Sequence, residues 1–287
     1  MNTLITLTTL SRAGLSFFAA CSAATGCLLV PGGTLGTALL AAVSVFLLAC
    51  GASALNQVQE HDIDSRMDRT RSRPVASGVL TTRSGLVIAL TFIVPGLFLI
   101  GLKGVLPLFL GIAAILWYNG LYTYLKRRSA FAAVPGAIVG AIPPAIGWTA
   151  GGGGLLDMRL LALCAIFFLW QVPHFWLLLL RHGEEYEKAG LPSLTRVMST
   201  SQIARVSFIW ILSAAVTTLL LPLFGLFTSP FLSWALVLPA VWLAWRGAAL
   251  IKMSPLSSAP ALFRTINIYL FILMTLLSFQ GIMLRVT

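Results

Sequence analysis

The most chemically suggestive pattern in this sequence is a run of four polar residues spaced by four: Asn56, Glu60, Asp64 and Asp68. On a continuous helix this spacing places all four on one face, with a drift of about 40° per step. Carboxylates stacked in this way repel one another unless a cation lies between them. Their oxygen atoms suit Mg²⁺, which commonly bridges to substrate phosphates. We therefore take these four as candidate catalytic residues of a metal and phosphate site, and leave out Asp62, which points off this face.

Basic residues flank the carboxylates. The segment from Arg69 to Arg73 reads RTRSR, and its guanidinium groups suit bidentate contacts to phosphate oxygens. Further along, YTYLKRR from Tyr122 ends an apolar run with three more cations. One of these could reach a diphosphate, and the others could serve only to stop membrane insertion. The alternative for the whole region is a salt-bridged loop that fixes topology, although such a loop has no need of four acids at this spacing.

A second acidic cluster lies in RHGEEYEK, from Arg181, directly after the apolar run WQVPHFWLLLL. Glu184 and Glu185 are its candidate metal ligands. The alternative is an interfacial helix end in which Glu184 pairs with Lys188 four residues later.

His174 stands inside that apolar run, and an ionisable residue within a membrane span is by default a candidate functional residue. The alternative is a neutral imidazole that hydrogen-bonds across the bundle. Aromatic residues gather near the charged segments, Tyr122 among them. Most suit the interfacial belt of a membrane protein, and a subset could line a cavity and stabilise a carbocation with their π faces.

The elements that carry these residues are apolar helices. The 287 residues are 58% hydrophobic and 9% charged, with a mean hydropathy of +0.94, which is typical of an integral membrane protein. We expect an all-α membrane bundle that forms one domain over residues 1–287. Nine segments approach the length needed to cross a bilayer: 13–31, 36–57, 84–102, 104–123, 131–150, 158–180, 203–222, 230–250 and 263–284.

The basic residues predict the orientation of these spans. If the loops after spans 2, 4, 6 and 8 share one side with the N-terminus, only Lys103, Arg159 and Arg285 of the 19 Lys and Arg lie opposite. This bias predicts a cytoplasmic N-terminus, an odd number of spans and both acidic clusters on the cytoplasmic side. The basic residues form no single patch that could track phosphates, so the formal charge of +11 does not indicate nucleic-acid binding. The four cysteines form no metal-binding pattern.

The stretch from Asn56 to Gly78 resembles the signature of the UbiA-type intramembrane prenyltransferases. Nine signature positions match in order: Asn56, Glu60, Ile63, Asp64, Met67, Arg69, Thr70, Arg73 and Gly78. The resemblance implies about nine helices around a central cavity that opens to the cytoplasm and to lipid, in a bacterial cytoplasmic (inner) membrane. It implies Mg²⁺ ligands at Asn56, Glu60, Asp64, Glu184 and Glu185, and diphosphate-binding cations at Arg69, Arg73, Lys126 and Arg127.

Within that superfamily, three further stretches resemble the protoheme IX farnesyltransferases. They are YTYLKR, GAIPPAIGW from Gly140, and FLWQVPHFWLLLL with EEYEKAGLPSL. This resemblance implies transfer of a farnesyl group from farnesyl diphosphate to a vinyl group of haem b, with Tyr122 and His174 near the acceptor. Two alternatives stay open. One is prenyl transfer to an aromatic quinone precursor, and the other is a transport or haem-handling membrane protein without catalysis.

Overall fold

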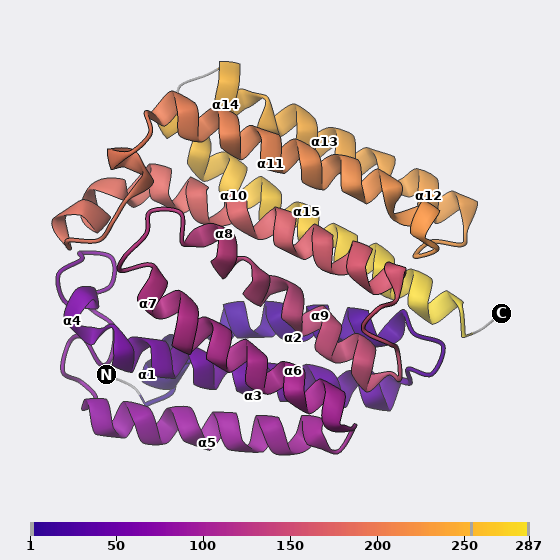
Figure 1. The fold of residues 1–287 in the computed structure, drawn as a ribbon, viewed down its shortest axis with the longest axis horizontal. Helices are drawn as coiled ribbons and strands as arrows, with labels where there is room; N and C mark the ends of the chain where they lie inside the picture. Colours follow the sequence, from indigo (N-terminus) through magenta and orange to yellow (C-terminus); the bar gives the residue numbers. More distant parts are fainter. Residues whose placement is uncertain (1–2, 253–254, 286–287) are drawn as a thin grey trace.

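The computed structural model describes residues 3–252 and 255–285, and every regular element in these ranges is a helix. The helices lie side by side in one bundle (Figure 1). The longer ones are α2 (Ala13–Leu28), α3 (Leu35–Gln59), α5 (Thr82–Gly101), α6 (Val105–Ile115), α9 (Ile138–Ala150), α10 (Met158–Lys188), α11 (Thr200–Leu220), α13 (Val237–Gly247) and α15 (Pro255–Met283). The shorter ones are α1 (Thr3–Leu10), α4 (His61–Asp64), the π-helix η1 (Leu116–Tyr122), α7 (Thr123–Leu125), α8 (Ala133–Gly136), η2 (Leu194–Arg196), η3 (Leu221–Phe224), α12 (Pro230–Ala235) and α14 (Ala249–Lys252).

Eight helices or helix runs in the described residues are long and apolar enough to cross a membrane, and the pair α1 and α2 makes a ninth if it is one span. The prediction of an all-α membrane bundle with about nine crossings is thus confirmed. The pair bends by 57° at Arg12, whose backbone adopts a left-handed conformation with φ 46°. That conformation is uncommon for a residue with a side chain.

Small residues let α2 approach α9 closely. A Cβ added to Gly26 would lie 2.1 Å from the Pro144 carbonyl oxygen, and one added to Gly147 would lie 1.7 Å from the Ala23 carbonyl oxygen. Lipid gives no hydrophobic driving force between helices, so close backbone packing of this kind holds membrane bundles together. The contact positions α2 against the same bundle interior that α3 and α10 line.

Two helix boundaries differ from the sequence predictions. Helix α3 ends at Gln59, and Glu60 starts a break before the single turn of α4, so the four polar residues spaced by four do not share one continuous helix. Conversely, α10 runs for 31 residues to Lys188. At a rise of 1.5 Å per residue it is about 46 Å long, longer than a hydrocarbon core of about 30 Å. The second acidic cluster therefore lies on the projecting end of a helix and not in a loop.

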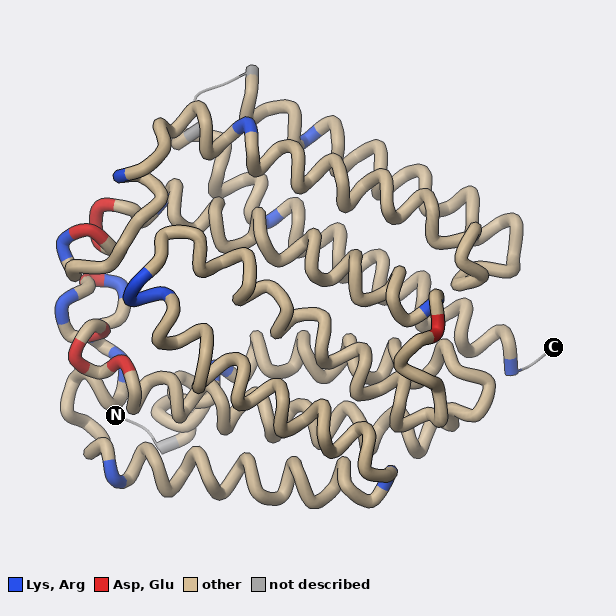
Figure 2. Tube along the Cα trace, viewed as in Figure 1, with Lys and Arg blue, Asp and Glu red and all other residues tan. Residues whose placement is uncertain are grey.

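Charge is concentrated at one end of the bundle. Figure 2 shows most acidic and basic residues gathered around the loop after α3, the end of α7 and the end of α10. Few charges lie at the opposite end, where the Arg159 guanidinium pairs with Asp157 at 2.6 Å and Arg285 donates to the Gly33 carbonyl at 2.8 Å. The charged end carries the loops that the sequence predicted to share one side.

Candidate active site

A cavity opens near the charged end and reaches into the apolar interior. Its walls come from α2, α3, α4, η1, α9 and α10, together with the loop after α4. The polar lining residues are Arg12, Ser16, Ser22, Ser53, Asn56, Glu60, Asp64, Arg69, Arg73, Tyr118, Tyr122, Lys126, Gln171, His174 and Tyr186. Deeper walls are mainly aliphatic and aromatic. A single cavity thus joins a charged mouth to an apolar interior.

Three of the four spaced polar residues meet at this mouth despite the break in the helix. Asn56, Glu60 and Asp64 are 1%, 2% and 3% exposed, and all three line the cavity. The Asn56 amide donates to Thr123 Oγ1 at 3.1 Å, which ties α3 to α7. Buried carboxylates need compensating cations or hydrogen bonds, and both Glu60 and Asp64 have them.

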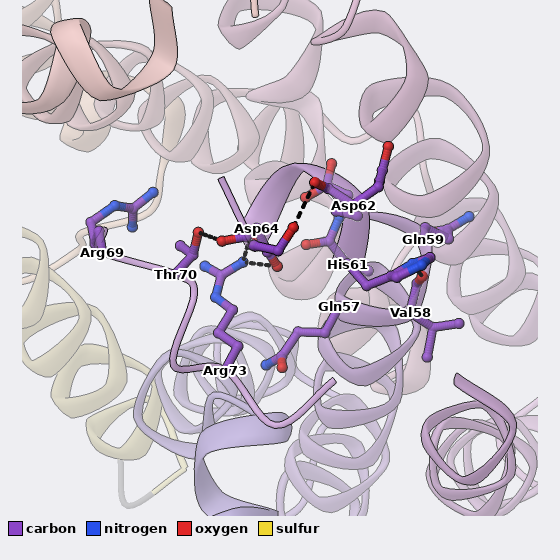
Figure 3. Close-up of polar contacts among 12 residues, drawn as sticks. Gln57, Val58, Gln59, His61, Asp62, Asp64, Arg69, Thr70 and Arg73 are labelled. Carbon is purple, nitrogen blue, oxygen red and sulfur yellow. Dashed lines mark hydrogen bonds and ion pairs between the residues drawn. The ribbon is translucent and has the colours of Figure 1, made fainter. Parts of the chain in front are cut away.

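The two carboxylates are paired differently. Arg73 donates to both oxygens of Asp64 at 2.7 Å (Figure 3), and the Thr70 hydroxyl donates to the Asp64 carbonyl at 3.0 Å. The Lys126 ammonium donates to Oε2 of Glu60. The other oxygen of Glu60, Oε1, is buried without a hydrogen-bond partner among the described residues. Both oxygens of Asp64 thus accept a bond from one nitrogen of Arg73, whereas Glu60 keeps one oxygen without a protein partner among the described residues.

Four cations face this cavity: Arg12, Arg69, Arg73 and Lys126. Burial lowers the pKa of the Arg73 guanidinium, and the nearby charge of Arg12 lowers it further, against the opposing effect of Asp64. No ion pair of Arg12 occurs within the described residues. Two guanidinium groups crowded at a buried mouth favour an anionic ligand.

Arg12 is a site residue that the motifs did not single out. It is the only charged residue before Glu60, and a lone cation at the start of a first span is easily attributed to membrane topology. Its left-handed backbone at the bend between α1 and α2 brings its side chain to the cavity, and that conformation leaves no signal in the sequence.

Four predicted site residues do not line the cavity. Asp68 is exposed and pairs with Arg71 at 3.3 Å. The other three predicted site residues that do not line the cavity are Arg127, Glu184 and Glu185. Because Glu60 breaks the helix, the chain has turned by Asp68, and the fourth carboxylate no longer follows the first three.

Arg127 lies beside Lys126 but points elsewhere. It donates to the Gln59 carbonyl at 2.6 Å and to the Asp62 carboxylate at 3.1 Å. It therefore completes the C-terminal end of α3. Of the predicted pair of cations, the structure brings only Lys126 to the cavity.

The second acidic cluster reaches the site through Tyr186, which the sequence reasoning did not select. Glu184 is exposed. Glu185 accepts from the Arg69 main-chain amide at 3.1 Å and contacts the His182 ring at 3.0 Å. Arg69 also donates to the Tyr186 hydroxyl at 3.3 Å. The end of α10 thus holds the loop after α4 in place over the cavity.

The π-helix η1 directs aromatic side chains inward. Tyr118 and Tyr122 stack at 5.9 Å between ring centroids, and Tyr122 stacks on Phe175 of α10 at 5.8 Å. Asn119 is turned toward α3, where it donates to the Ala52 carbonyl at 3.0 Å. The wide turn brings Tyr118, Tyr122 and, one turn later, Lys126 to the same cavity, as π-bulges often do at functional sites.

His174 lies deeper, on α10. Its ring centroid is 4.8 Å from that of Trp170 and 4.6 Å from that of Phe263 on α15. Its Nδ1 is 3.1 Å from the Asn267 side-chain oxygen. The structure brings Tyr122 and His174 to one cavity, and the Lys126 ammonium lies 5.8 Å from the centroid of the Tyr122 ring.

Comparison with known proteins identifies the fold and its lineage. Residues 14–274 match the UbiA prenyltransferase family. The chain belongs to this family. The UbiA-type membership predicted from the stretch between Asn56 and Gly78 is therefore confirmed, and the chain is an integral membrane protein.

The sequence similarity to individual relatives covers most of the chain. The protoheme IX farnesyltransferase of Geobacter sulfurreducens is 40% identical over 234 residues, which cover 82% of this chain and 87% of the relative. That of Oleidesulfovibrio alaskensis is 39% identical over 253 residues, 88% of each chain.

Solved structures with the UbiA fold are more distant in sequence. The apo UbiA homolog from Aeropyrum pernix K1 has a TM-score of 0.73 at 19% identity, covering 92% of this chain and 99% of that one. The Archaeoglobus fulgidus homolog bound to GPP and Mg²⁺ has a TM-score of 0.67 at 14% identity, covering 96% and 99%. At these identities the similarity establishes the fold alone.

Proposed function

We propose that this chain transfers a farnesyl group from farnesyl diphosphate to a vinyl group of protoheme IX (haem b), giving haem O. The observation that carries this proposal is the similarity to protoheme IX farnesyltransferases at about 40% identity over four fifths of the chain. The cavity supports it, because a cationic mouth suits a diphosphate and an apolar interior suits a prenyl chain and a porphyrin. A single prenyltransferase domain accounts for the whole of residues 1–287.

At the mouth, the diphosphate is held by Lys126, Arg69 and Arg73, and Arg12 joins them. These cations stabilise the negative charge that grows on the leaving group, which is electrostatic catalysis by preorganised groups. Lys126 and Arg73 are already fixed by their bonds to Glu60 and Asp64, so little reorganisation accompanies substrate binding.

The donor set at the mouth fits Mg²⁺. Oε1 of Glu60 is buried without a partner, and Asn56 uses its amide nitrogen on Thr123, which leaves its oxygen available. Asp64 supplies a third hard oxygen ligand. The described residues hold no group of three or more His, Cys, Asp or Glu suited to bind a metal, and we propose that oxygen atoms of the diphosphate would complete the coordination. We leave Glu184 and Glu185 out of this set, because neither lines the cavity.

Bound in this way, Mg²⁺ would supply Lewis-acid stabilisation of the leaving diphosphate. The allylic C–O bond breaks, and its electron pair leaves with the diphosphate. Tyr118, Tyr122 and Phe175 present their π faces and exclude water around the allylic cation. The terminal vinyl carbon of the haem then forms a C–C bond to the allylic carbon. Water adds to the carbocation next to the porphyrin and releases a proton, which gives a hydroxyethylfarnesyl substituent.

The acceptor lies against His174, and Tyr118, Tyr122 and Phe175 stand between it and the diphosphate. We propose that the active site faces the cytoplasm from a bacterial cytoplasmic (inner) membrane, because the positive-inside rule predicts that the charged end of the bundle lies on that side. Both substrates are apolar over most of their surface, and they enter from membrane lipid.

The product assay tests this proposal. Purified protein with farnesyl diphosphate, haem b and Mg²⁺ should release diphosphate and form haem O, which mass spectrometry detects. Chelation of divalent cations should stop both, and added Mg²⁺ should restore them. Prenylation of an aromatic quinone precursor with no haem product would overturn the assignment of the acceptor. Tight haem binding without diphosphate release from the protein under any of these conditions would favour a haem-handling role and overturn catalysis.

A further inference from the structure

We infer that Asn267 is a positioning residue, which holds the His174 imidazole in one tautomer so that its Nε2 is free to bind the iron of the haem acceptor. This inference rests on the proposed function, and it adds a residue on α15 that lies outside the cavity lining. Asn267 stands 93 positions after His174, and no sequence motif connects the two.

The orientation of the Asn267 amide follows from its second contact. Its nitrogen donates to the Phe263 carbonyl at 2.7 Å, and a carbonyl oxygen can only accept. The amide oxygen must therefore face Nδ1 of His174, at 3.1 Å. An oxygen acceptor in that position requires a proton on Nδ1, so neutral His174 keeps its lone pair on Nε2.

Aromatic neighbours fix the plane of the same ring. Trp170 and Phe263 lie at 4.8 and 4.6 Å between centroids, and Phe175 contacts it edge-on at 5.8 Å. The indole nitrogen of Trp170 donates to the Ile266 carbonyl at 2.9 Å. Two hydrogen bonds thus join α10 to α15 next to this ring. Together with the aromatic contacts, they fix the position and the rotation of the imidazole.

His174 belongs to the wall of the cavity in which the haem acceptor is expected. His174 lines the cavity, and no hydrogen bond to its Nε2 is present among the described residues. Neutral imidazole is a common axial ligand of haem iron. Metal-binding histidines almost always donate their other ring N–H to an oxygen acceptor, which sets the tautomer and raises the basicity of the ligand. Asn267 supplies that acceptor.

Spectroscopy of bound haem tests the inference. Ferric protoporphyrin IX is titrated into purified protein, and its electronic and electron paramagnetic resonance spectra report imidazole ligation. Asn267→Leu removes the acceptor at similar volume, and we expect haem affinity through this ligation to fall about 10- to 100-fold. Asn267→Asp retains an acceptor oxygen and should keep the ligation. His174→Ala should abolish it.

Thr265→Val is the matched control. Thr265 lies on α15, is buried, and donates to the Ala261 carbonyl at 3.1 Å, so the variant also loses a bond to the carbonyl four residues earlier. It should leave the haem spectrum unchanged. Thermal unfolding and farnesyl diphosphate binding should be alike in the Thr265 and Asn267 variants. If Asn267→Leu does not fold, Asn267→Ala removes the same acceptor without added bulk.

Different results overturn different statements. A wild-type spectrum in Asn267→Leu or Asn267→Ala would refute the positioning role, and an unchanged spectrum in His174→Ala would refute iron ligation. Either result leaves farnesyl transfer to haem intact if haem O is still formed by the wild-type protein. Absence of haem O with intact ligation would instead reject the proposed reaction.

Discussion

At the scale of single residues, the buried carboxylates at the cavity mouth pair with cations, and one oxygen of Glu60 has no partner among the described residues. Both oxygens of Asp64 accept from Arg73, whereas Glu60 uses one oxygen on Lys126 and leaves the other buried and unpaired among the described residues. An unsatisfied buried carboxylate oxygen is costly unless a ligand completes it. The site is therefore preorganised for a cation together with an anion, and not for either alone.

Asp64 and Asp68 belong to the same sequence pattern but should differ in function. Asp64→Asn should lower turnover by about 10²- to 10³-fold, the usual loss when one preorganised electrostatic group is removed. Asp68→Asn should leave turnover near wild type, because Asp68 is exposed and pairs only with Arg71. Diphosphate release, normalised to folded protein, measures both. Equal losses in the two variants would contradict the site described here.

Lys126 and Arg127 provide a second contrast between neighbours. Lys126→Met should raise the KM for farnesyl diphosphate and lower kcat, because a cation is lost from the cavity wall. Arg127→Met should leave both near wild type and reduce stability by about 0.2–1 kcal/mol, the range for a partly exposed ion pair. Steady-state kinetics and thermal unfolding separate the two effects. A kinetic defect confined to Arg127→Met would reverse the assignment.

The effect of Arg127 should also depend on pH. Burial opposes ionisation of Asp62, but the hydrogen bond and charge of Arg127 prevail and hold the pKa of Asp62 below its ordinary value. A carboxyl with a lowered folded-state pKa adds stability above its unfolded pKa of about 3.9, and that stability is lost as the pH falls through the folded value. The difference in Tm between wild type and Arg127→Met should thus persist above about pH 4 and shrink below it. A difference that grows on acidification would contradict this.

At the scale of elements, irregular helix geometry places the functional groups. The bend at Arg12 and the π-helix η1 turn side chains into the cavity that a regular helix would direct elsewhere, and the break at Glu60 turns Asp68 away from it. The length of α10 carries Tyr186 beyond the membrane core, where it contacts Arg69. Each irregularity depends on close packing by the regular helices around it.

Two glycines of α2 test that packing. Gly26→Ala should destabilise the protein by about 1–3 kcal/mol, because its Cβ would lie 2.1 Å from the Pro144 carbonyl. Gly14→Ala, on the same helix with nothing within 4 Å of the added Cβ, should be neutral or stabilise by up to about 1 kcal/mol through helix propensity. Thermal unfolding in detergent provides the measurement. Equal stability of both variants would mean that α2 and α9 do not pack as described.

At the scale of the whole molecule, the uneven distribution of charge along the bundle predicts its orientation in the membrane. The loop after α3 and the end of α10 lie at the charged end, and the end of α15 lies at the opposite one (Figure 2). The positive-inside rule predicts that the charged end faces the cytoplasm. A substrate with a charged head and an apolar body would then bind with its head at the charged mouth of the cavity and its body in the apolar interior.

Single introduced cysteines test this orientation. In a background with Cys21, Cys27, Cys50 and Cys164 replaced by serine, an impermeant maleimide should label Gly154→Cys in intact cells. Ser65→Cys should be labelled only after the cells are opened. Both positions are exposed, so access and not burial decides the result. Labelling of Ser65→Cys alone in intact cells would invert the topology.

The sequence by itself determined the class, the spans and the first half of the site. Apolar run length and the distribution of Lys and Arg are read directly from single residues, and the bilayer permits few other structures for such runs. The spacing of Asn56, Glu60 and Asp64 also survived the break in the helix, because the single turn of α4 keeps Asp64 on the cavity side.

Only the tertiary structure decided which neighbours complete the site. It selected Lys126 over Arg127, excluded Asp68, added Arg12 and Tyr186, and paired His174 with Asn267. Contacts between helices depend on the rotation and axial offset of each helix, and the whole bundle sets both. A residue turns by about 100° per step along a helix, so one break or one π-turn changes which side chain faces the cavity without changing any local motif.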